Sequence, residues 1–170
     1  MNSEGCKKVG SGNTPPPRGR GMGRGLFPGS FDPFTKGHDD IVRRALTLFD
    51  EVVIAVGYNE NKAGWMPVEE RVAAIRKLYA GESRVTVESY TGLTVDFAKE
   101  KGITAIVRGV RITADFEFEM QLADVNRQLS GIETILLPAS PQFASFSSSI
   151  VRELSHFGYD VSQFLPNATR

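Results

Sequence analysis

The chain has 170 residues, of which 41% are hydrophobic and 24% are charged, and its formal net charge at pH 7 is zero. This composition is ordinary for one soluble globular domain, and no apolar run approaches the roughly 20 residues that a membrane-spanning helix requires. The N-terminus lacks the hydrophobic segment of a secretory signal, so we expect a cytoplasmic protein with no membrane partner. The single cysteine, Cys6, cannot form an intrachain disulfide and lacks a second thiolate for a metal ion, which argues against redox chemistry and a zinc site.

The first 24 residues differ in composition from the rest of the chain. They are rich in Gly, Pro, Ser, Asn and Arg, and such a segment buries too little apolar surface to offset the entropy of ordering it. We interpret residues 1–24 as a disordered or vector-derived tail, with a basic docking arm as the alternative, and residues 25–170 as the folded domain. Five basic residues against Glu4 alone give the tail a charge of +4, and because the whole chain is neutral the remainder carries −4. An acidic body argues against a nucleic-acid partner, since such binding depends on clustered Lys and Arg.

Strand and helix patterns alternate along the rest of the chain. The strand-like segments are expected at residues 23–27, 52–56, 85–88, 105–107 and 134–137. The helical segments are an apolar run from Ile41 to Phe49 and residues 67–78, 95–101 and 115–129. This alternation predicts an α/β fold, namely a single-domain, Rossmann-like, doubly wound sheet of five parallel strands with helices on both faces. The weakest element is the first strand, which is rich in glycine and poor in β-forming residues.

A glycine-rich turn precedes the first helix, in the ten residues Gly29-Ser-Phe-Asp-Pro-Phe-Thr-Lys-Gly-His38. The first turn of a helix has backbone N–H groups without partners and a partial positive charge, so an anion bound there is stabilised before any side chain acts. Glycines such as Gly29 and Gly37 let the backbone approach that anion closely. The segment therefore predicts a phosphate-binding site. Its end, Thr35-Lys36-Gly37-His38, matches the (T/H)-x-G-H signature of the nucleotidyltransferase superfamily.

Each predicted strand is followed by a segment that carries polar or glycine residues. These segments are Ser30, Tyr58–Lys62, Gly92–Thr94, Arg108–Arg111 and Gln142–Ser149. Ligands of parallel α/β sheets bind beyond the carboxyl ends of the strands, near the point where the strand order reverses. We therefore expect these five segments to meet at one crevice.

A second constellation, Arg108-Gly-Val-Arg-Ile-Thr-Ala-Asp-Phe-Glu-Phe-Glu-Met-Gln121, follows the fourth predicted strand. Its two arginines present planar guanidinium groups, which bind phosphate oxygens bidentately. The acidic residues Asp115, Glu117 and Glu119 at the start of the next helix can orient these groups or bind ribose hydroxyls. Neither a P-loop motif nor a G-x-G-x-x-G at the end of a strand occurs, which argues against kinase-like and dinucleotide redox chemistry.

The spacing R-G-x-R-x-x-x-D-F-E-x-E-x-Q in this segment resembles that of the bacterial phosphopantetheine adenylyltransferases, a family of coenzyme A biosynthesis. Together with the first motif, Phe143–Ser149 and Phe164-Leu165-Pro166, the resemblance covers Leu26–Pro166. In that family the 4′-phosphate of phosphopantetheine attacks the α-phosphorus of ATP, which releases pyrophosphate and forms dephospho-coenzyme A. The resemblance implies the same reaction here, without a covalent nucleophile and with catalysis by positioning and charge stabilisation.

The resemblance also assigns residues to catalysis and to the two substrates. The implied catalytic residues are His38, Ser30, Lys62 and Arg111, and His38 would contact the ATP phosphates and stabilise the transition state. The implied phosphopantetheine-binding residues are Ser30, Lys62, Thr94 and Arg108. The implied ATP-binding residues are Ser30, Phe31, His38, Gly109, Val110, Arg111, Glu119, Phe143, Ala144, Ser145, Phe146, Ser147, Ser148 and Ser149. One of the last three serines is also expected to act as an ordinary helix N-cap.

The resemblance further implies Mg²⁺, bound mainly through ATP phosphates and without a protein ligand set, because this ion keeps its waters and often binds through phosphates. It also implies a homohexamer and feedback inhibition by coenzyme A. Two alternatives remain open: a related transferase that acts on nicotinamide mononucleotide or glycerol phosphate, and a nucleotide-sensing module without turnover. The Arg108–Gln121 segment speaks against the first alternative. The joint presence of Lys62 and Arg108 on the acceptor side speaks against the second.

Overall fold

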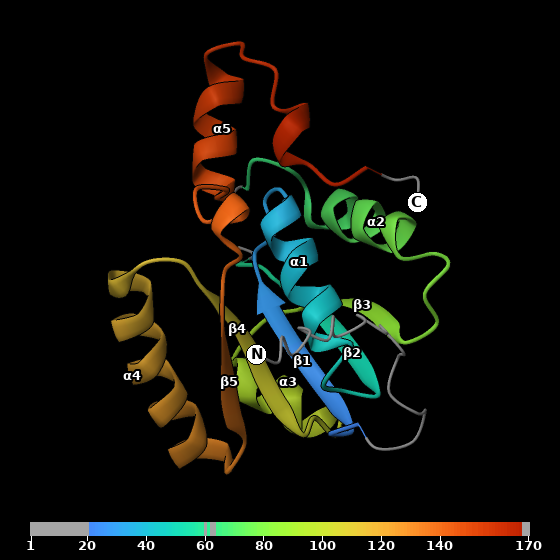
Figure 1. Cartoon of the computed structure of the whole chain (residues 1–170). Helices are drawn as coiled ribbons and strands as arrows, with labels where there is room; N and C mark the ends of the chain where they lie inside the picture. The colour runs from blue at the N-terminus through green and yellow to red at the C-terminus, as the bar shows by residue number, and fades with distance from the viewer. Residues whose placement is uncertain (1–20, 60, 62–63, 168–170) are drawn as a thin grey trace, which may run out of the picture.

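The computed structural model describes residues 21–59, 61 and 64–167 of the chain (Figure 1). The strands are β1 (Arg24–Gly29), β2 (Glu51–Gly57), β3 (Val85–Tyr90), β4 (Ala105–Val110) and β5 (Glu133–Pro138). The helices are α1 (Lys36–Ala45), α2 (Val68–Leu78), α3 (Thr94–Glu100), α4 (Thr113–Ser130) and α5 (Ser148–His156), with short 3₁₀ helices η1 (Pro141–Phe143) and η2 (Ser162–Phe164). Within these described ranges, no helix combines the length and the apolar character that crossing a membrane would need.

The strands pair in the order β3-β2-β1-β4-β5, and every neighbouring pair is parallel. From β1 to β3, each new strand pairs with the one before it, toward one edge of the sheet. The chain then returns to β1, and β4 and β5 are added on the other side of it. The strand order reverses between β1 and β4, which is where ligands of such sheets bind. This arrangement confirms the doubly wound, Rossmann-like, five-stranded sheet that the sequence predicts.

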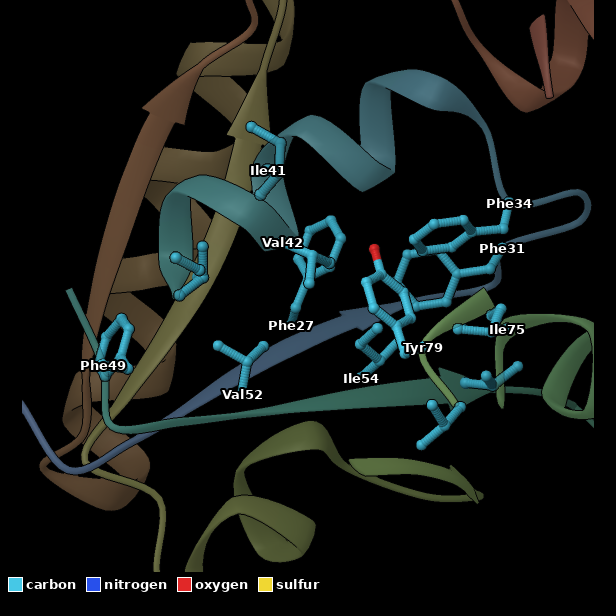
Figure 2. Packing of buried hydrophobic residues seen from close by; sticks show 14 of the residues in the cluster. Phe27, Phe31, Phe34, Ile41, Val42, Phe49, Val52, Ile54, Ile75 and Tyr79 are labelled. Atoms are coloured by element: carbon cyan, nitrogen blue, oxygen red, sulfur yellow. The ribbon is translucent and has the colours of Figure 1, made fainter. Parts of the chain in front are cut away.

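Two hydrophobic cores cover the opposite faces of the sheet. On one face, Val52 and Ile54 of β2 pack with residues of α1 and α2, including Val42 and Ile75 (Figure 2). On the other face, Val53 of the same strand belongs to a second cluster that includes the buried residues of α3. Successive residues of a strand point to opposite faces, so a strand buried on both faces is apolar throughout. This is why residues 52–56 form an uninterrupted apolar run, and it confirms helices on both faces.

The strand with the weakest sequence signal, β1, occupies the centre of the sheet. Leu26 has no exposed surface and Phe27 only 4%, so burial between two neighbouring strands compensates for the low β-propensity of this segment. Packing explains why residue 25 is a glycine, because a Cβ at this position would lie 2.8 Å from the ring of Phe49. Phe49 itself lies beyond the end of α1 at Ala45, so the helical run predicted up to Phe49 is too long.

The N-terminal boundary of the domain lies earlier than the sequence indicates. β1 begins at Arg24, the last residue assigned to the tail, and the Met22 N–H already donates to the carbonyl of Leu48. Residues 1–20, which make up the rest of the predicted tail, lie outside the described residues. The described part of the domain therefore includes residues 21–24.

The largest boundary change among the strands concerns β4, which continues to Val110, whereas the predicted strand ends at residue 107. Arg108 and Gly109 interrupt the apolar pattern, but their backbones still pair with Leu136 and Leu137 of β5. Among the later helices, α4 extends the predicted 115–129 at both ends, and Pro67 is the N-cap of α2 rather than its first residue. The segment 108–110 therefore belongs to the sheet and not to the loop after it.

The two central strands, β1 and β4, pair over only part of their length. Their register joins Gly25 to Ala105 and Leu26 to Ile106, whereas β1 pairs with β2 along all six of its residues. In the part of β1 that no longer pairs with β4, Pro28 has no backbone N–H to donate. The carboxyl-terminal halves of the two strands are therefore free of each other at the point where the strand order reverses.

We predict that Gly25→Ala lowers the free energy of unfolding by about 1–3 kcal/mol, because the added methyl group overlaps the Phe49 ring in a filled core. Gly81→Ala is the matched control, since a Cβ at that position meets no atom within 4 Å. Its effect should stay within about 0.5 kcal/mol. Urea unfolding followed by circular dichroism measures both, and equal stabilities of the two variants would contradict the packing role of Gly25.

Candidate active site

A cavity of about 290 Å³ lies where β1 and β4 part. Its walls come from the end of β1 with the following loop, the start of α1, the β4–α4 region, and the segment that joins η1 to α5. The predicted site residues that line it are Ser30, Phe31, His38, Arg108, Gly109, Arg111, Glu119, Phe143, Phe146, Ser147, Ser148 and Ser149. Groups from distant parts of the chain therefore meet at one cavity.

Four predicted site residues are not among those that line this cavity: Thr94, Val110, Ala144 and Ser145. Thr94 begins α3, and its hydroxyl shares a hydrogen bond of 2.8 Å with that of Tyr90. Lys62 lies outside the described residues. Of the five segments expected to meet, the three at Ser30, 108–111 and 142–149 contribute described lining residues, and the segments 58–62 and 92–94 do not.

His38 is held by a capping box at the start of α1. Thr35 is the N-cap, and its hydroxyl accepts the backbone N–H of His38 at 3.4 Å. In return, the backbone N–H of Thr35 donates to Nδ1 of the imidazole at 3.0 Å. Because Nδ1 accepts this hydrogen bond, the proton of the neutral ring resides on Nε2. The helix cap thus fixes both the orientation of the ring and the nitrogen that remains as a donor.

The surroundings of His38 keep its imidazole uncharged. The rings of Phe31 and Phe34 lie beside it, with centroid distances of 5.1 and 5.3 Å. Burial, together with the smaller effect of the positive charges of Arg111 and Arg108, lowers the pKa of His38 from 6.5 to about 4. At pH 7 the ring is therefore a neutral hydrogen-bond donor, and among the described lining residues the positive charge comes from Arg108 and Arg111.

Arg108 is fixed by three hydrogen bonds within the protein. Its Nε and Nη2 donate to the two carboxylate oxygens of Glu119 at 2.8 and 2.6 Å. Its Nη1 donates to the carbonyl of Pro28 at 2.7 Å, across the gap between β4 and β1. Glu119 is only 6% exposed, so this bidentate pair is largely shielded from water. A guanidinium has five N–H groups, and the two that remain can bind an anion.

Arg111 is oriented in a similar way but closer to the surface. Its Nε donates to Asp115 at 3.0 Å, and the pair lies at the start of α4. An exposed pair of this kind adds little stability, so its main effect is on the direction of the guanidinium. Asp115 and Glu119 therefore orient the two arginines, as the sequence suggests, and Glu119 does so from a buried position.

The loop after β1 is anchored from several sides. The buried carboxylate of Asp32 accepts the backbone N–H groups of Trp65 and Met66 at 2.7 and 2.9 Å. Arg152 of α5 donates to the carbonyl of Asp32 at 2.5 Å, and Arg71 of α2 donates to the carbonyl of Ser30 at 2.6 Å. The predicted phosphate-binding turn is thus attached to the β2–α2 loop, to α2 and to α5.

The three consecutive serines at the start of α5 have separate roles. Ser147 is the N-cap, and its hydroxyl accepts the N–H of Ile150 at 3.2 Å, which confirms that one of the three serves as an ordinary cap. The hydroxyl of Ser148 donates to the carbonyl of Pro33 at 2.7 Å, and that of Ser149 accepts from Arg152 at 3.2 Å. The hydroxyl of Ser148 therefore also ties α5 to the loop after β1, a structural use that the sequence did not indicate.

Sequence reasoning missed Asp32, Arg71 and Arg152 as supports of the site. For Arg71 a signal existed, because the residue lies three positions after Val68 on the apolar face of α2 and is nevertheless charged. Asp32 is flanked by Phe31 and Pro33, and nothing in such a local pattern reveals that its carboxylate reaches a loop more than 30 residues away. Contacts of this kind depend on the tertiary fold.

The donors around the cavity suit an anion rather than a bare cation. Two guanidinium groups, the neutral imidazole and the N-terminus of α1 all present N–H groups. In the part of the chain that the structure describes, no three His, Cys, Asp or Glu side chains gather in a way that could hold a metal ion.

We predict that His38 titrates near pH 4, because burial and the two guanidinium groups oppose protonation. The chain has two histidines, so in a His156→Gln variant the only remaining imidazole is that of His38, and its NMR chemical shift can be followed directly. The unfolded chain binds more protons than the folded one between the folded and unfolded pKa values. Stability should therefore fall as the pH drops from 6.5 toward 4. A titration midpoint near 6.5 would contradict the buried, neutral state.

The chain matches a family model described as cytidylyltransferase-like over residues 26–154. It is 56% identical over 149 residues to a phosphopantetheine adenylyltransferase of Phocaeicola vulgatus, which covers 88% of this chain and 99% of the relative. It is 47% identical over 145 residues to a phosphopantetheine adenylyltransferase of Streptomyces coelicolor, covering 85% and 91%. A solved bifunctional NMN adenylyltransferase/ADP ribose pyrophosphatase from Francisella tularensis has the same fold, with a TM-score of 0.65, 18% identity, and coverage of 86% of this chain and 45% of that chain. The chain therefore belongs to the phosphopantetheine adenylyltransferase family of cytidylyltransferase-like nucleotidyltransferases.

Proposed function

We propose that this protein transfers the adenylyl group of ATP to the 4′-phosphate of phosphopantetheine, which yields dephospho-coenzyme A and pyrophosphate. In a chain of this family, the observation that carries the proposal is that His38, Arg108 and Arg111 line one cavity at the N-terminus of α1. The curated relatives are matched over nearly their whole length, which supports a shared reaction rather than a shared fold alone.

The reaction joins two anions, and the positive charges and hydrogen-bond donors of the site offset the repulsion between them. An oxygen of the acceptor phosphate bonds to the α-phosphorus of ATP, and the bond from that phosphorus to the oxygen of the leaving pyrophosphate breaks. Catalysis consists of in-line positioning and of stabilising the negative charge on the transferred group. Arg108 and Arg111 supply fixed positive charge, and the Nε2–H of His38 supplies a neutral donor. No side chain needs to form a covalent bond with the substrate.

We assign the acceptor phosphate to Ser30, Lys62 and Arg108, and the ATP phosphates to His38, Arg111 and the segment 143–149. Ser30 suits contact with both substrates, because it is exposed at the cavity directly after β1. Arg108 keeps two N–H groups beyond those bound to Glu119 and Pro28. The roles of Lys62 and of the Thr94 backbone, which would touch the pantetheine arm, rest on the family resemblance.

We further propose that Mg²⁺ enters with ATP and is held through its phosphates. The carboxylates nearest the cavity, Asp115 and Glu119, already pair with Arg111 and Arg108. An ion that retains its waters and bridges phosphate oxygens needs few protein ligands. When bound, it neutralises phosphate charge, while the residues described above orient the two substrates.

We propose that the protein forms a homo-oligomer, specifically a hexamer. α4 exposes several large apolar side chains, namely Phe116, Phe118, Met120, Val125 and Leu129. β5 forms one edge of the sheet and pairs only with β4 within the described residues. Exposed apolar side chains on a helix beside a free sheet edge are typical of surfaces that bind another subunit. A cytoplasmic location and feedback inhibition by coenzyme A complete the proposal by analogy with the family.

The direct test is to incubate the protein with ATP, Mg²⁺ and 4′-phosphopantetheine and to quantify pyrophosphate and dephospho-coenzyme A. We expect both products in equal amounts, because one adenylyl group moves for each pyrophosphate released. Nicotinamide mononucleotide and glycerol phosphate serve as competing acceptors. Product from one of these acceptors alone would overturn the substrate assignment, and ATP binding without any turnover would favour the nucleotide-sensing alternative.

We predict that His38→Ala lowers kcat by about 10²-fold or more, because the variant lacks one fixed donor to the transition state. The KM for ATP should change little, since the arginines and the start of α1 still bind the phosphates. His156→Ala is the control, because that histidine lies on α5 and does not line the cavity. An unchanged kcat in the His38 variant would remove this residue from the mechanism.

A further inference from the structure

Arg71 is a charged residue on the apolar face of α2. Only 7% of its surface is exposed, and Val72 and Ile75 of the same helix are buried in the core. Its Nε has no hydrogen-bond partner within the described part of the chain. Removing a guanidinium from water is costly, and leaving one of its donors unpaired adds to that cost. Packing alone would be served at least as well by an apolar side chain.

The guanidinium of Arg71 holds a single backbone atom of the cavity wall. Its Nη1 donates to the carbonyl oxygen of Ser30 at 2.6 Å, which links α2 to the residue directly after β1. Ser30 and Phe31 line the cavity, whereas Arg71 does not. The arginine therefore lies behind the wall and acts on it through the backbone.

This contact fixes the orientation of one peptide group. The bond between Ser30 and Phe31 is trans, and the carbonyl and N–H of a trans peptide point in opposite directions. Because the carbonyl is held toward Arg71, the N–H of Phe31 points away from it. The structure gives this N–H no acceptor among the described residues. A donor without a partner beside a cavity lined by cations is suited to an anionic oxygen.

Phe31 needs support to keep this geometry. Its φ of 48° lies in the left-handed region, which a bulky side chain rarely adopts. The carbonyls on either side of it are both held by buried or half-buried arginines, that of Ser30 by Arg71 and that of Asp32 by Arg152. Its ring packs so closely on Gly29 that a Cβ there would lie 2.9 Å away. The strained backbone of Phe31 is thus held by hydrogen bonds to the carbonyls on both sides of it and by the packing of its ring.

We propose that Arg71 is a positioning residue, whose guanidinium turns the Ser30–Phe31 peptide so that the Phe31 N–H donates to a phosphate oxygen of the bound nucleotide. The inference rests on the proposed function for the identity of that phosphate. Arg71 does not touch the substrate. It stabilises the arrangement in which the loop presents its backbone donor and the Ser30 side chain together.

The kinetic test compares Arg71→Met with Arg76→Met. Arg76 is the matched control, because it lies on the same helix and also donates to a backbone carbonyl, that of Val87 at 2.9 and 3.1 Å, away from the cavity. We expect Arg71→Met to lower kcat by about tenfold or more, with the KM for ATP within about threefold of wild type, because misplacement of a donor acts mainly on the transition state. Arg76→Met should keep kcat within about twofold. Equal kcat values for the two variants would overturn the proposal.

Arg71→Lys extends the test if the methionine variant does not fold. An ammonium group can still donate to one carbonyl but lacks the planar fork of a guanidinium. We therefore expect the kcat of Arg71→Lys to lie between those of wild type and Arg71→Met. If only the lysine variant folds, its kcat should be about threefold below that of wild type.

A second readout needs no turnover: the amide signal of Phe31 in protein labelled with ¹⁵N-phenylalanine, assigned by its loss in Phe31→Leu. It should move on addition of Mg-ATP in wild type and in Arg76→Met, and move less in Arg71→Lys.

The two readouts separate this inference from the proposed function. Absence of dephospho-coenzyme A with wild-type protein would refute the function, and the Phe31 amide would still report on the phosphate contact. An amide that moves equally in wild type and in Arg71→Lys would refute the positioning role, whatever the acceptor substrate is.

Discussion

The parting of β1 and β4 after Leu26 and Ile106 is the constraint on which the site depends. Had the two strands paired to their ends, backbone hydrogen bonds would close the space that the cavity occupies. Arg108 remains in the sheet through its backbone pairing with β5, and its side chain reaches across to the carbonyl of Pro28. A side-chain hydrogen bond thus takes the place of a strand-to-strand one. The exchange brings a guanidinium to the carboxyl end of the sheet, beside the N-terminus of α1.

The charges at this cavity are arranged before any ligand binds. Arg108 and Arg111 are held by Glu119 and Asp115, so their guanidinium groups would need little reorganisation to bind an anion. The same two positive charges, together with burial, keep the imidazole of His38 neutral. A third cation would raise the repulsion within the site, whereas a neutral Nε2–H can donate to an anion without adding charge. The positive charges of Arg108 and Arg111 thus help to keep His38 a neutral hydrogen-bond donor.

Much of the fold could be predicted from the sequence because its signals are local. The apolar run at 52–56 and the turn that ends in Thr35-x-Gly37-His38 specify a buried strand and a helix start without reference to the rest of the chain. The end of β4 could not be placed, since Arg108 breaks the apolar pattern while its backbone still pairs with β5. The hydrogen bonds from Ser148 to Pro33 and from Trp65 to Asp32 join segments that are far apart in sequence, so no local pattern could predict them. The role of Lys62 stays a prediction, because that residue lies outside the described part of the chain.

Three features that general rules of protein structure disfavour lie in or next to the loop after β1. A proline stands in the central strand at residue 28, Phe31 adopts a left-handed backbone, and Arg71 buries a guanidinium on an apolar helix face. Each feature carries a cost in stability, and away from this region the core consists of ordinary apolar packing on both faces of the sheet. Proteins keep such costly features mainly where function requires them. The clustering of these three features around one loop therefore supports the proposed site at the loop after β1, independently of the motifs that mark the family.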